Sequence, residues 1–209
     1  MPTTRGTGLS WVVFDYGEVL SERTAALPEL AGLLGVPQAE FEPAYWAHRE
    51  AYDRGATDHA YWQAVADTVG TEVDAATIAR LTRTDIAGWS RLAPGTPDLL
   101  ATLERDGHRL ALLSNAPASF AAHTRRQPWL RSFSEVLFSA ETGSAKPDPE
   151  IFALLLDRLG TDGGECLFVD DRELNVHAAR RAGLNAHLWP GTTTDALSLI
   201  RSCSPGVVP

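Results

Sequence analysis

Asp15 directly follows a short apolar run, Trp11–Phe14, in the segment FDYGEVL. Such a run is typical of a buried strand in a parallel sheet, so we expect Asp15 at the end of a strand. A carboxylate placed there can act as a nucleophile or bind a metal ion. Acid–base chemistry usually requires a second carboxyl group close by. Two residues on, however, the chain has Gly17, and only the next residue, Glu18, is acidic.

Other polar side chains also follow apolar runs along the chain. The apolar runs cover residues 11–14, 109–113, 136–138, 166–169 and 186–189. The polar residues that follow the middle three are Ser114, Asn115, Lys146, Asp170 and Asp171. Helical patterns at residues 98–106, 149–159 and 174–182 alternate with these runs, which is typical of βαβ units. Because parallel strands present their carboxyl ends at one edge of the sheet, we expect these side chains to lie near Asp15.

Residues 22–92 have a different pattern from the rest of the chain. Helical stretches cover residues 27–34, 38–52, 58–69 and 74–89, and no strand is predicted among them. This block begins at the carboxyl end of the first strand, where open α/β sheets bind their ligands. We therefore predict an α/β fold, a Rossmann-like, doubly wound parallel sheet core. Residues 1–21 and 93–209 form this core, and residues 22–92 form an inserted all-helical cap that covers Asp15.

The polar residues at the sheet edge have a shared use in handling a phosphate ester. A carboxylate repels an anionic phosphate, so Asp15 needs a cation to offset the charge. Mg²⁺ is suited to this role because it takes carboxylate oxygens together with water and phosphate, and Asp15 and Asp171 would supply the carboxylates. Lys146 adds a fixed positive charge, and Ser114 can hold a phosphoryl oxygen. The expected cofactor is Mg²⁺, and the expected partner is a small phosphorylated molecule.

Four segments in order resemble the motifs of the haloacid dehalogenase-like hydrolase superfamily: FDYGEVL, LLSNAP, AKPDPEIF and FVDDRELNVHAARRAG. The resemblance covers residues 11 to 200 and implies a Rossmann-like core with a helical cap. It implies a phospho-aspartyl intermediate on Asp15, with Ser114 and Lys146 as further catalytic residues. The metal ligands it implies are Asp15, the backbone carbonyl of Gly17, Asp171 and, in support, Asp170 and Asn175. The substrate-binding residues we expect are Asn115, Gly17 and Glu18.

The sequence departs from the family at Gly17, where most phosphatases of this superfamily have an Asp that protonates the leaving alcohol. A dehalogenase needs no such proton, but that branch typically has uncharged residues in place of Asp170 and Asp171. A phosphatase subgroup with an Asp-x-Gly first motif, which includes α-glucose-1-phosphate phosphatases, fits the acidic pair better. A non-catalytic protein that binds phosphate is the third alternative. We favour the phosphatase and a small phosphate monoester as substrate, with a sugar phosphate as one candidate. Glu18 is then either a substitute acid or simply solvated.

Composition excludes several other classes of function. The chain has 18 basic and 27 acidic residues, a net charge of −9, and no basic stripe that would suit a nucleic acid. No apolar run approaches the roughly 18 residues of a membrane span. The 2 cysteines lack the spacing of a zinc site. We expect a soluble cytoplasmic protein, and the sequence does not predict its oligomeric state.

Some residues in or near the cap have plausible secondary roles. Trp46 and Tyr52 are expected in the hydrophobic core of the cap. Arg49 or Arg54 could meet a second anionic group of the substrate. Asp148, which precedes the helical pattern at 149–159, is expected to cap that helix.

Overall fold

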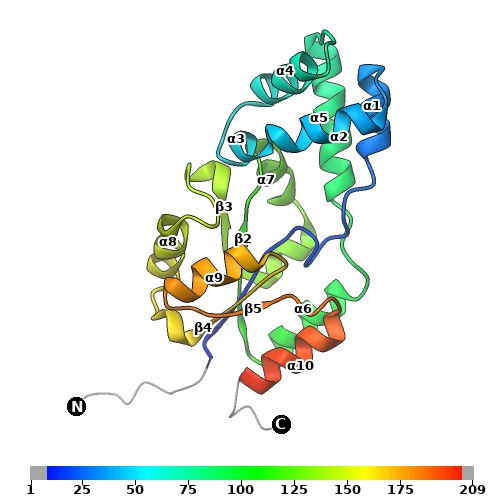
Figure 1. The fold of residues 1–209 in the computed structure, drawn as a ribbon. Coiled ribbons are helices and arrows are strands. Elements are labelled where there is room, and N and C mark those ends of the chain that lie inside the picture. The colour runs from blue at the N-terminus through cyan, green and yellow to red at the C-terminus, as the bar shows by residue number, and fades with distance from the viewer. Residues whose placement is uncertain (1–8, 204–209) are drawn as a thin grey trace, which may run out of the picture.

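The computed structural model describes residues 9–203, and its larger part is built around a five-stranded parallel sheet (Figure 1). The strand order is β3-β2-β1-β4-β5, and all neighbouring strands are parallel. The strands are β1 (Trp11–Phe14), β2 (Arg109–Ser114), β3 (Phe133–Phe138), β4 (Cys166–Asp170) and β5 (Asn185–Leu188). All five predicted strands are present. The continuous apolar sequence of β1 follows from its central position, which buries both of its faces.

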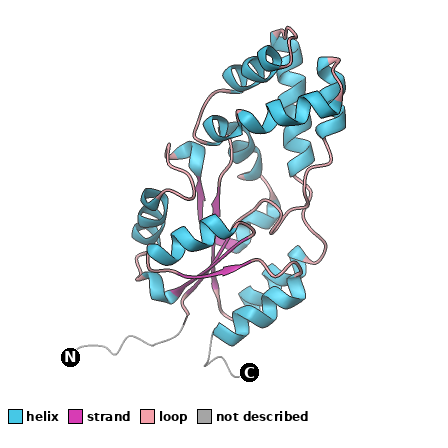
Figure 2. Cartoon of the chain, viewed as in Figure 1, coloured by secondary structure: helices cyan, strands magenta, loops and turns pink. Residues whose placement is uncertain are grey.

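Helices cover both faces of this sheet, as in a doubly wound fold (Figure 2). Val12 and Phe14 pack with α6, α7 and α10, whereas Trp11 and Val13 pack with α8 and α9 on the opposite face. The helices are α6 (Thr96–Arg105), α7 (Ala118–Thr124), α8 (Pro149–Leu159), α9 (Glu173–Arg181) and α10 (Thr193–Cys203). Three short 3-10 helices are η1 (Pro128–Ser132), η2 (Ser139–Glu141) and η3 (Gly163–Glu165). The predicted α/β, Rossmann-like fold is therefore confirmed.

Helix α8 shows why some helix boundaries could be predicted. Pro149 at its start has the backbone angle of a helix and lacks an N–H that would otherwise be unsatisfied. Gly160 ends the helix with a φ of 62°, a left-handed conformation that suits glycine. The observed bounds match the prediction. Helices α7 and α10 have weaker signals of this kind and were not predicted.

A separate group of helices lies beyond the carboxyl end of β1 and forms its own hydrophobic core (Figure 1). Its helices are α1 (Leu27–Leu34), α2 (Gln38–Ala47), α3 (Arg49–Asp53), α4 (Asp58–Thr68) and α5 (Ala75–Trp89). Its core is rich in aromatic rings, and Tyr52 stacks on Tyr61 with 4.1 Å between ring centroids. Tyr52 is therefore a core residue as predicted. Trp46 is 38% exposed, so its predicted place in the core was wrong.

The single helix predicted at residues 38–52 is in fact two helices, which meet at His48. Pro43 inside α2 has no N–H to donate, so the hydrogen-bond ladder is weakened before the break. Beyond the break, α3 is oriented so that Tyr52 packs in the core of the helical group. Sequence periodicity alone does not predict this change of direction, because it depends on the packing of Tyr52 against α4.

Two linkers join the helical group to the sheet, and they are hydrogen-bonded to each other. Ser21 and Leu92 form an isolated antiparallel bridge, and the Glu22 N–H donates to the Arg91 carbonyl at 2.9 Å. Gly88 lies where α5 passes the first linker. A Cβ on Gly88 would come within 2.4 Å of the Thr24 hydroxyl, so only glycine allows this close approach.

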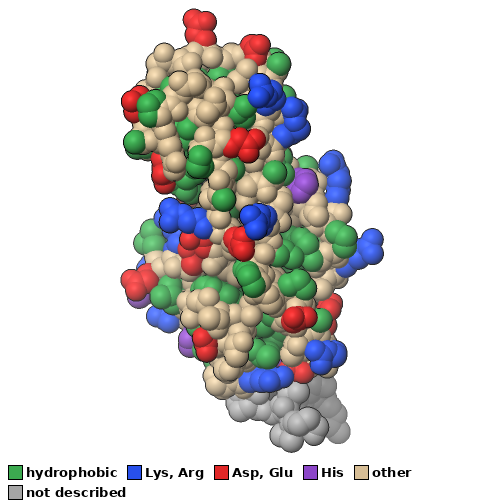
Figure 3. Space-filling model, turned by 90° about the vertical axis from the view of Figure 1, so that its right-hand side faces the viewer, with side chains coloured by type: hydrophobic (Ala, Val, Ile, Leu, Met, Phe, Trp, Pro, Cys, Tyr) green, Lys and Arg blue, Asp and Glu red, His purple; other side chains and the backbone are tan. Residues whose placement is uncertain are grey.

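Two further features concern the surface charge and the length of the helices. On the face shown in Figure 3, acidic and basic side chains are interspersed, with no extended basic stripe. Within residues 9–203, no helix is both long and apolar enough to cross a membrane.

Candidate active site

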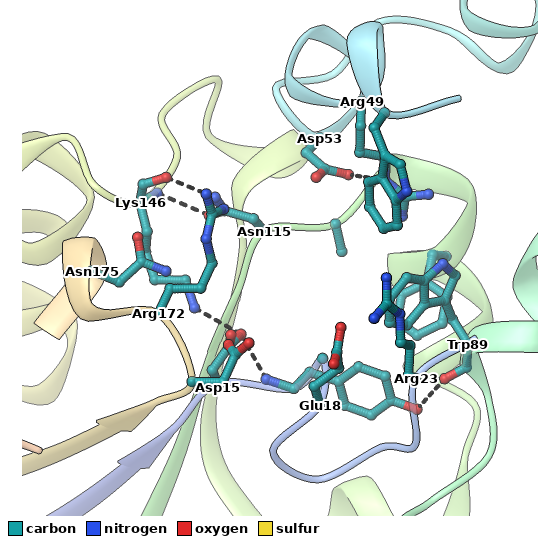
Figure 4. Close-up of a pocket in the computed structure, with 16 residues that line it drawn as sticks. Asp15, Glu18, Arg23, Arg49, Asp53, Trp89, Asn115, Lys146, Arg172 and Asn175 are labelled. Atoms are coloured by element: carbon teal, nitrogen blue, oxygen red, sulfur yellow. Dashed lines mark hydrogen bonds and ion pairs between the residues drawn. The ribbon is translucent and has the colours of Figure 1, made fainter. Parts of the chain in front are cut away.

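The carboxyl ends of β1 and β4 bring two carboxylates to the same lysine (Figure 4). Lys146 Nζ lies 2.7 Å from Asp15 Oδ1 and 2.7 Å from Asp170 Oδ2. All three residues are buried, with exposed fractions of 7% for Asp15, 3% for Lys146 and 0% for Asp170. A buried ammonium between two carboxylates offsets part of their negative charge, whereas any one of these charges buried alone would be costly. The strand-end grouping expected from the sequence is therefore present for these residues.

Asp170 has both of its oxygens occupied by partners within the protein. Its Oδ1 accepts from the Arg172 N–H and from Asn175 Nδ2, both at 2.9 Å. Its Oδ2 accepts from Lys146 Nζ at 2.7 Å. Asp170 thus holds Lys146 and the start of α9 in place. It has less capacity than Asp15 or Asp171 to bind an additional group.

Electrostatics make Asp15 difficult to ionise in the structure as it stands. Burial raises its pKa to about 7 against the opposing effect of Lys146, and the nearby carboxylates of Asp170 and Asp171 raise it further. Burial also raises the pKa of Asp171, to which Asp170 and Glu18 contribute by repulsion. For Lys146, burial disfavours the charge, but Asp15 and Asp170 outweigh it and raise the pKa. A further cation beside Asp15 and Asp171 would favour the ionised nucleophile.

The same residues fit a divalent cation. Oxygens of Asp15, Asp170 and Asp171 lie within 4.8 Å of one another, a grouping that suits a hard metal ion. Asp15 Oδ1 is bonded to Lys146 and to the Tyr16 N–H, which leaves Oδ2 as its available oxygen. Asn175 Oδ1 is buried and has no hydrogen-bond partner in the described chain, so a polar atom next to the cluster is unsatisfied. These oxygens suit Mg²⁺ better than a softer metal.

Ser114 and Asn115 lie at the end of β2, as predicted, but they are used differently. Asn115 lines the cavity. Its side-chain amide forms two hydrogen bonds with the main chain of Lys146: Nδ2 donates to the carbonyl at 2.7 Å, and Oδ1 accepts from the N–H at 2.8 Å. Asn115 therefore fixes the Lys146 loop against β2. Ser114 is 3% exposed and is not among the cavity-lining residues in the described chain. Direct contacts of Ser114 and Asn115 with a substrate stay predictions.

Gly17 and Glu18 both line the cavity beside Asp15. Glu18 has a φ of 56°, and it is the one non-glycine residue in the described chain with a positive φ. This left-handed conformation costs energy for a residue with a side chain. The Glu18 carboxylate points into the cavity (Figure 4), so the expectation that it borders the substrate site stays open.

The cavity above Asp15 has a volume of about 400 Å³ and is bounded on the far side by the helical group. Several of its lining residues were not among the predicted site residues: Arg23, Trp46, Asp53, Trp89, Phe120 and Arg172. They come from a linker, from the helical group and from the starts of α7 and α9. Their positions depend on how the helical group packs over the sheet, so the sequence did not identify them as part of the site.

Arg49 and Asp53 extend from α3 into the cavity opposite Asp15 (Figure 4). Arg49 Nε donates to Asp53 Oδ1 at 2.9 Å, and its Nη1 lies 3.2 Å from Asp85 Oδ2. The Tyr45 hydroxyl also accepts from Arg49 and donates to Asp85 at 2.7 Å. Two carboxylates thus compensate one guanidinium. Arg49 lines the cavity, where it could meet an anionic group of the substrate, but its positive charge is already paired with Asp53 and Asp85.

Arg54 and Asp148 have roles that the sequence analysis did not anticipate. Arg54 does not line the cavity, and it forms an ion pair with Asp148, with Nη2 to Oδ1 at 3.1 Å. Asp148 sits at the start of α8, but its side chain makes no capping hydrogen bond, so the predicted cap was wrong.

Two more contacts join helix α3 to the sheet region. The Ser139 hydroxyl donates to the Asp53 carbonyl, and Tyr52 Oη lies 3.2 Å from Ser119 Oγ. Helix α3 is therefore fastened to the sheet region at three points.

Comparison with known proteins gives a family by sequence and a shared fold by structure. The family model for haloacid dehalogenase-like hydrolases matches residues 10–183. A curated relative, "Phosphatase MT3486" from Mycobacterium tuberculosis, is 28% identical over 188 residues, which cover 86% of this chain and 87% of that protein.

Two solved structures show the fold in other members. The HAD family enzyme BT-2542 from Bacteroides thetaiotaomicron, in complex with magnesium and inorganic phosphate, is 23% identical, has a TM-score of 0.67, and is matched over 87% of this chain and 94% of its own. The L-2-haloacid dehalogenase RSc1362 is 17% identical, has a TM-score of 0.72, and is matched over 93% and 99%. The fold is therefore common to phosphate-binding and dehalogenating members. From the family match and the site geometry, the chain belongs to the haloacid dehalogenase-like hydrolases and is an enzyme of this family.

Proposed function

We propose that this hydrolase is a Mg²⁺-dependent phosphatase that cleaves a small phosphate monoester, with sugar phosphates as the first candidates. A carboxylate oxygen of Asp15 attacks phosphorus, the bond from phosphorus to the leaving oxygen breaks, and the phosphoryl group is carried on Asp15 until water releases it. Mg²⁺ would be held by Asp15, Asp171 and the Gly17 carbonyl, with Asp170 in support, and it would neutralise charge between the nucleophile and the phosphate.

The observation that carries this proposal is the retained acidic pair together with Lys146. Oxygens of Asp15, Asp170 and Asp171 gather within 4.8 Å, which is an unfavourable arrangement without a cation. A dehalogenase that uses no metal would gain nothing from three crowded carboxylates. Lys146 stays protonated because its pKa is raised, so it can offset the negative charge of the transferred group. Ser114 and the N–H groups after β2 would hold the remaining phosphoryl oxygens.

The helices of residues 22–92 act, in this proposal, as a cap over the reaction. The aromatic and charged residues that they contribute to the cavity exclude bulk water and contact the leaving group. No carboxyl group stands at residue 17 to protonate that leaving group, so esters with good leaving groups are expected to react fastest.

Phosphate release from para-nitrophenyl phosphate tests the proposal. Wild-type protein with Mg²⁺ should turn over, EDTA should stop the reaction, and Asp15→Asn should lower turnover by about 10⁴-fold or more. Asp157→Asn, which changes a carboxylate on α8 away from the cavity, is the matched control. Halide release from a 2-haloacid without Mg²⁺, in place of phosphate release, would overturn the proposal in favour of a dehalogenase. Absence of both reactions would leave a protein that binds phosphate without cleaving it.

A further inference from the structure

Asp53 is held in a fixed orientation above the cavity. Its Oδ1 accepts from Arg49 Nε at 2.9 Å, and Arg49 is itself fixed by Asp85 and Tyr45. Its backbone carbonyl accepts from the hydroxyl of Ser139, which belongs to the sheet region. The Asp53 side chain is 14% exposed. Asp53 is thus restrained through its side chain by the cap and through its backbone by the core.

The second carboxylate oxygen of Asp53 is available to a ligand. Asp53 lines the cavity, and no residue within 9–203 donates a hydrogen bond to its Oδ2. Figure 4 shows the Asp53 carboxylate facing the space that separates it from Asp15. A leaving group attached to a phosphate at Asp15 would extend into that space. The preorganised oxygen can therefore accept a hydrogen bond from the leaving group without reorganising the cap.

The charges around the cavity argue against a second anion on the leaving group. Lys146 and Arg49 each lie between two carboxylates. Arg23 and Arg172 also line the cavity, and Arg172 is close enough to Asp53 to lower its pKa. A carboxylate that reached Asp53 Oδ2 would meet a like charge, whereas a neutral hydroxyl would not.

We propose that Asp53 is a specificity residue that accepts a hydrogen bond from a hydroxyl group of the leaving alcohol. The site then prefers phosphate esters of neutral, hydroxylated alcohols over esters whose alcohol carries a carboxylate. This inference rests on the proposed function, because it needs a phosphate ester bound at Asp15. Burial raises the pKa of Asp53 against the lowering effect of Arg49, which is consistent with a carboxyl group kept from water and presented to a hydroxyl.

Three esters with the same three-carbon skeleton separate the contributions: sn-glycerol 3-phosphate, propyl phosphate and 3-phosphoglycerate. Dissociation constants are measured calorimetrically with Mg²⁺ present, using Asp15→Asn so that no ester is consumed. The protein with Asp53 should bind sn-glycerol 3-phosphate about tenfold to a hundredfold more tightly than propyl phosphate, because a hydroxyl bonds a carboxylate. 3-Phosphoglycerate should bind more weakly than both.

Substitution of Asp53 should remove this preference. Asp53→Ala is expected to give equal dissociation constants for sn-glycerol 3-phosphate and propyl phosphate. Asp53→Asn is expected to tighten the binding of 3-phosphoglycerate relative to propyl phosphate. Asp67→Asn, an exposed cap carboxylate outside the cavity, should change none of the ratios. An equal loss for all three esters in Asp53→Ala would show a merely structural role and overturn the proposal.

Two further outcomes separate this inference from the proposed function. Phosphate release from propyl phosphate by wild-type protein, with binding ratios unchanged in Asp53→Ala, would overturn the role of Asp53 alone. Failure of all three esters to bind would overturn both.

Discussion

The sheet edge and the cap contribute to the same cavity by different physical means. At the sheet edge, Lys146 is fully enclosed between Asp15 and Asp170, and each of these groups depends on the others for its charge. In the cap, Arg49 and Asp53 are also paired, but Asp53 keeps one oxygen free toward the cavity. The first arrangement fixes a reaction centre that tolerates little change. The second presents one adjustable contact, so chemistry and selection of the substrate can change separately.

The largest expected effect on stability comes from breaking the sheet-edge cluster at Lys146, the one lysine in the chain. Lys146→Met leaves the carboxylates of Asp15 and Asp170 buried without a cation, and it should destabilise the fold by about 3–5 kcal/mol. Turnover should fall by about 10²–10³-fold because a charge at the phosphoryl group is lost. Urea unfolding and phosphate release measure the two effects.

The control for Lys146→Met is Arg158→Met, which breaks a partly exposed ion pair with Glu135. Its cost should be below about 1 kcal/mol. Similar destabilisation by the two variants would show that the buried cluster is no more important than a surface pair.

A gain of activity is expected from Gly17→Asp. A Cβ at this position would meet only Trp89, at 3.7 Å, and the backbone of Gly17 is not in the left-handed region. The new carboxyl group would lie beside Asp15 and could protonate the leaving group, so turnover of an alkyl phosphate should rise up to about 10²-fold. An aryl phosphate should change little because its leaving group needs no proton.

The control is Gly17→Asn, because an Asn side chain has nearly the shape of an Asp side chain but cannot donate a proton as an acid at neutral pH. The measurement is the steady-state rate of phosphate release by each variant from the alkyl and from the aryl phosphate. An equal response of the Asn and Asp variants would rule out the missing acid as the cause of slow alkyl ester hydrolysis.

The free energy of unfolding should depend on pH because the pKa of Asp15 is raised in the folded protein. Because its folded-state pKa is raised to about 7 from the ordinary value of 3.8, the folded protein retains a proton that the unfolded chain loses between these values. The free energy of unfolding should therefore fall as pH rises from about 4 to 7, by about 2 kcal/mol between pH 5 and 7. Denaturant unfolding in EDTA measures it.

Asp15→Asn should show a smaller decline over the same pH range, and Mg²⁺ at pH 7 should restore stability to wild type but not to the variant. Identical pH profiles for wild type and Asp15→Asn in EDTA would contradict a raised pKa at this residue.

The smallest expected effect concerns the fastening of the cap. Arg54→Ala removes the ion pair with Asp148, which lies outside the cavity and is partly exposed. We expect KM to rise about two- to fivefold, equivalent to 0.5–1 kcal/mol, with little change in kcat. Arg91→Ala, which removes a pair with Glu22 between the linkers, is the matched control. A large loss of kcat in Arg54→Ala would place the ion pair in the chemical step instead.

The same contrast explains what the sequence could predict. The strands and the residues that follow them could be predicted because buried parallel strands have continuous apolar sequences, and their carboxyl ends share one edge. The role of Asn115 in holding the Lys146 backbone could not be predicted, because it depends on two loops meeting. In the cap, Asp53 and Trp46 have no local signature. Their place at the cavity follows from the break at His48 and from the packing of the aromatic core.

The hydrogen bond from Tyr16 Oη to the Trp89 carbonyl, at 2.8 Å, has a consequence for the modularity of the molecule. Tyr16 also donates its backbone N–H to Asp15, so one residue joins the nucleophile to the end of helix α5. The acceptor at residue 89 is a main-chain group and is therefore independent of the side chain there. A cap transplanted from another member could keep this connection if its last helix ends at the same point. The recombination junctions that preserve it are the paired residues Ser21 and Leu92.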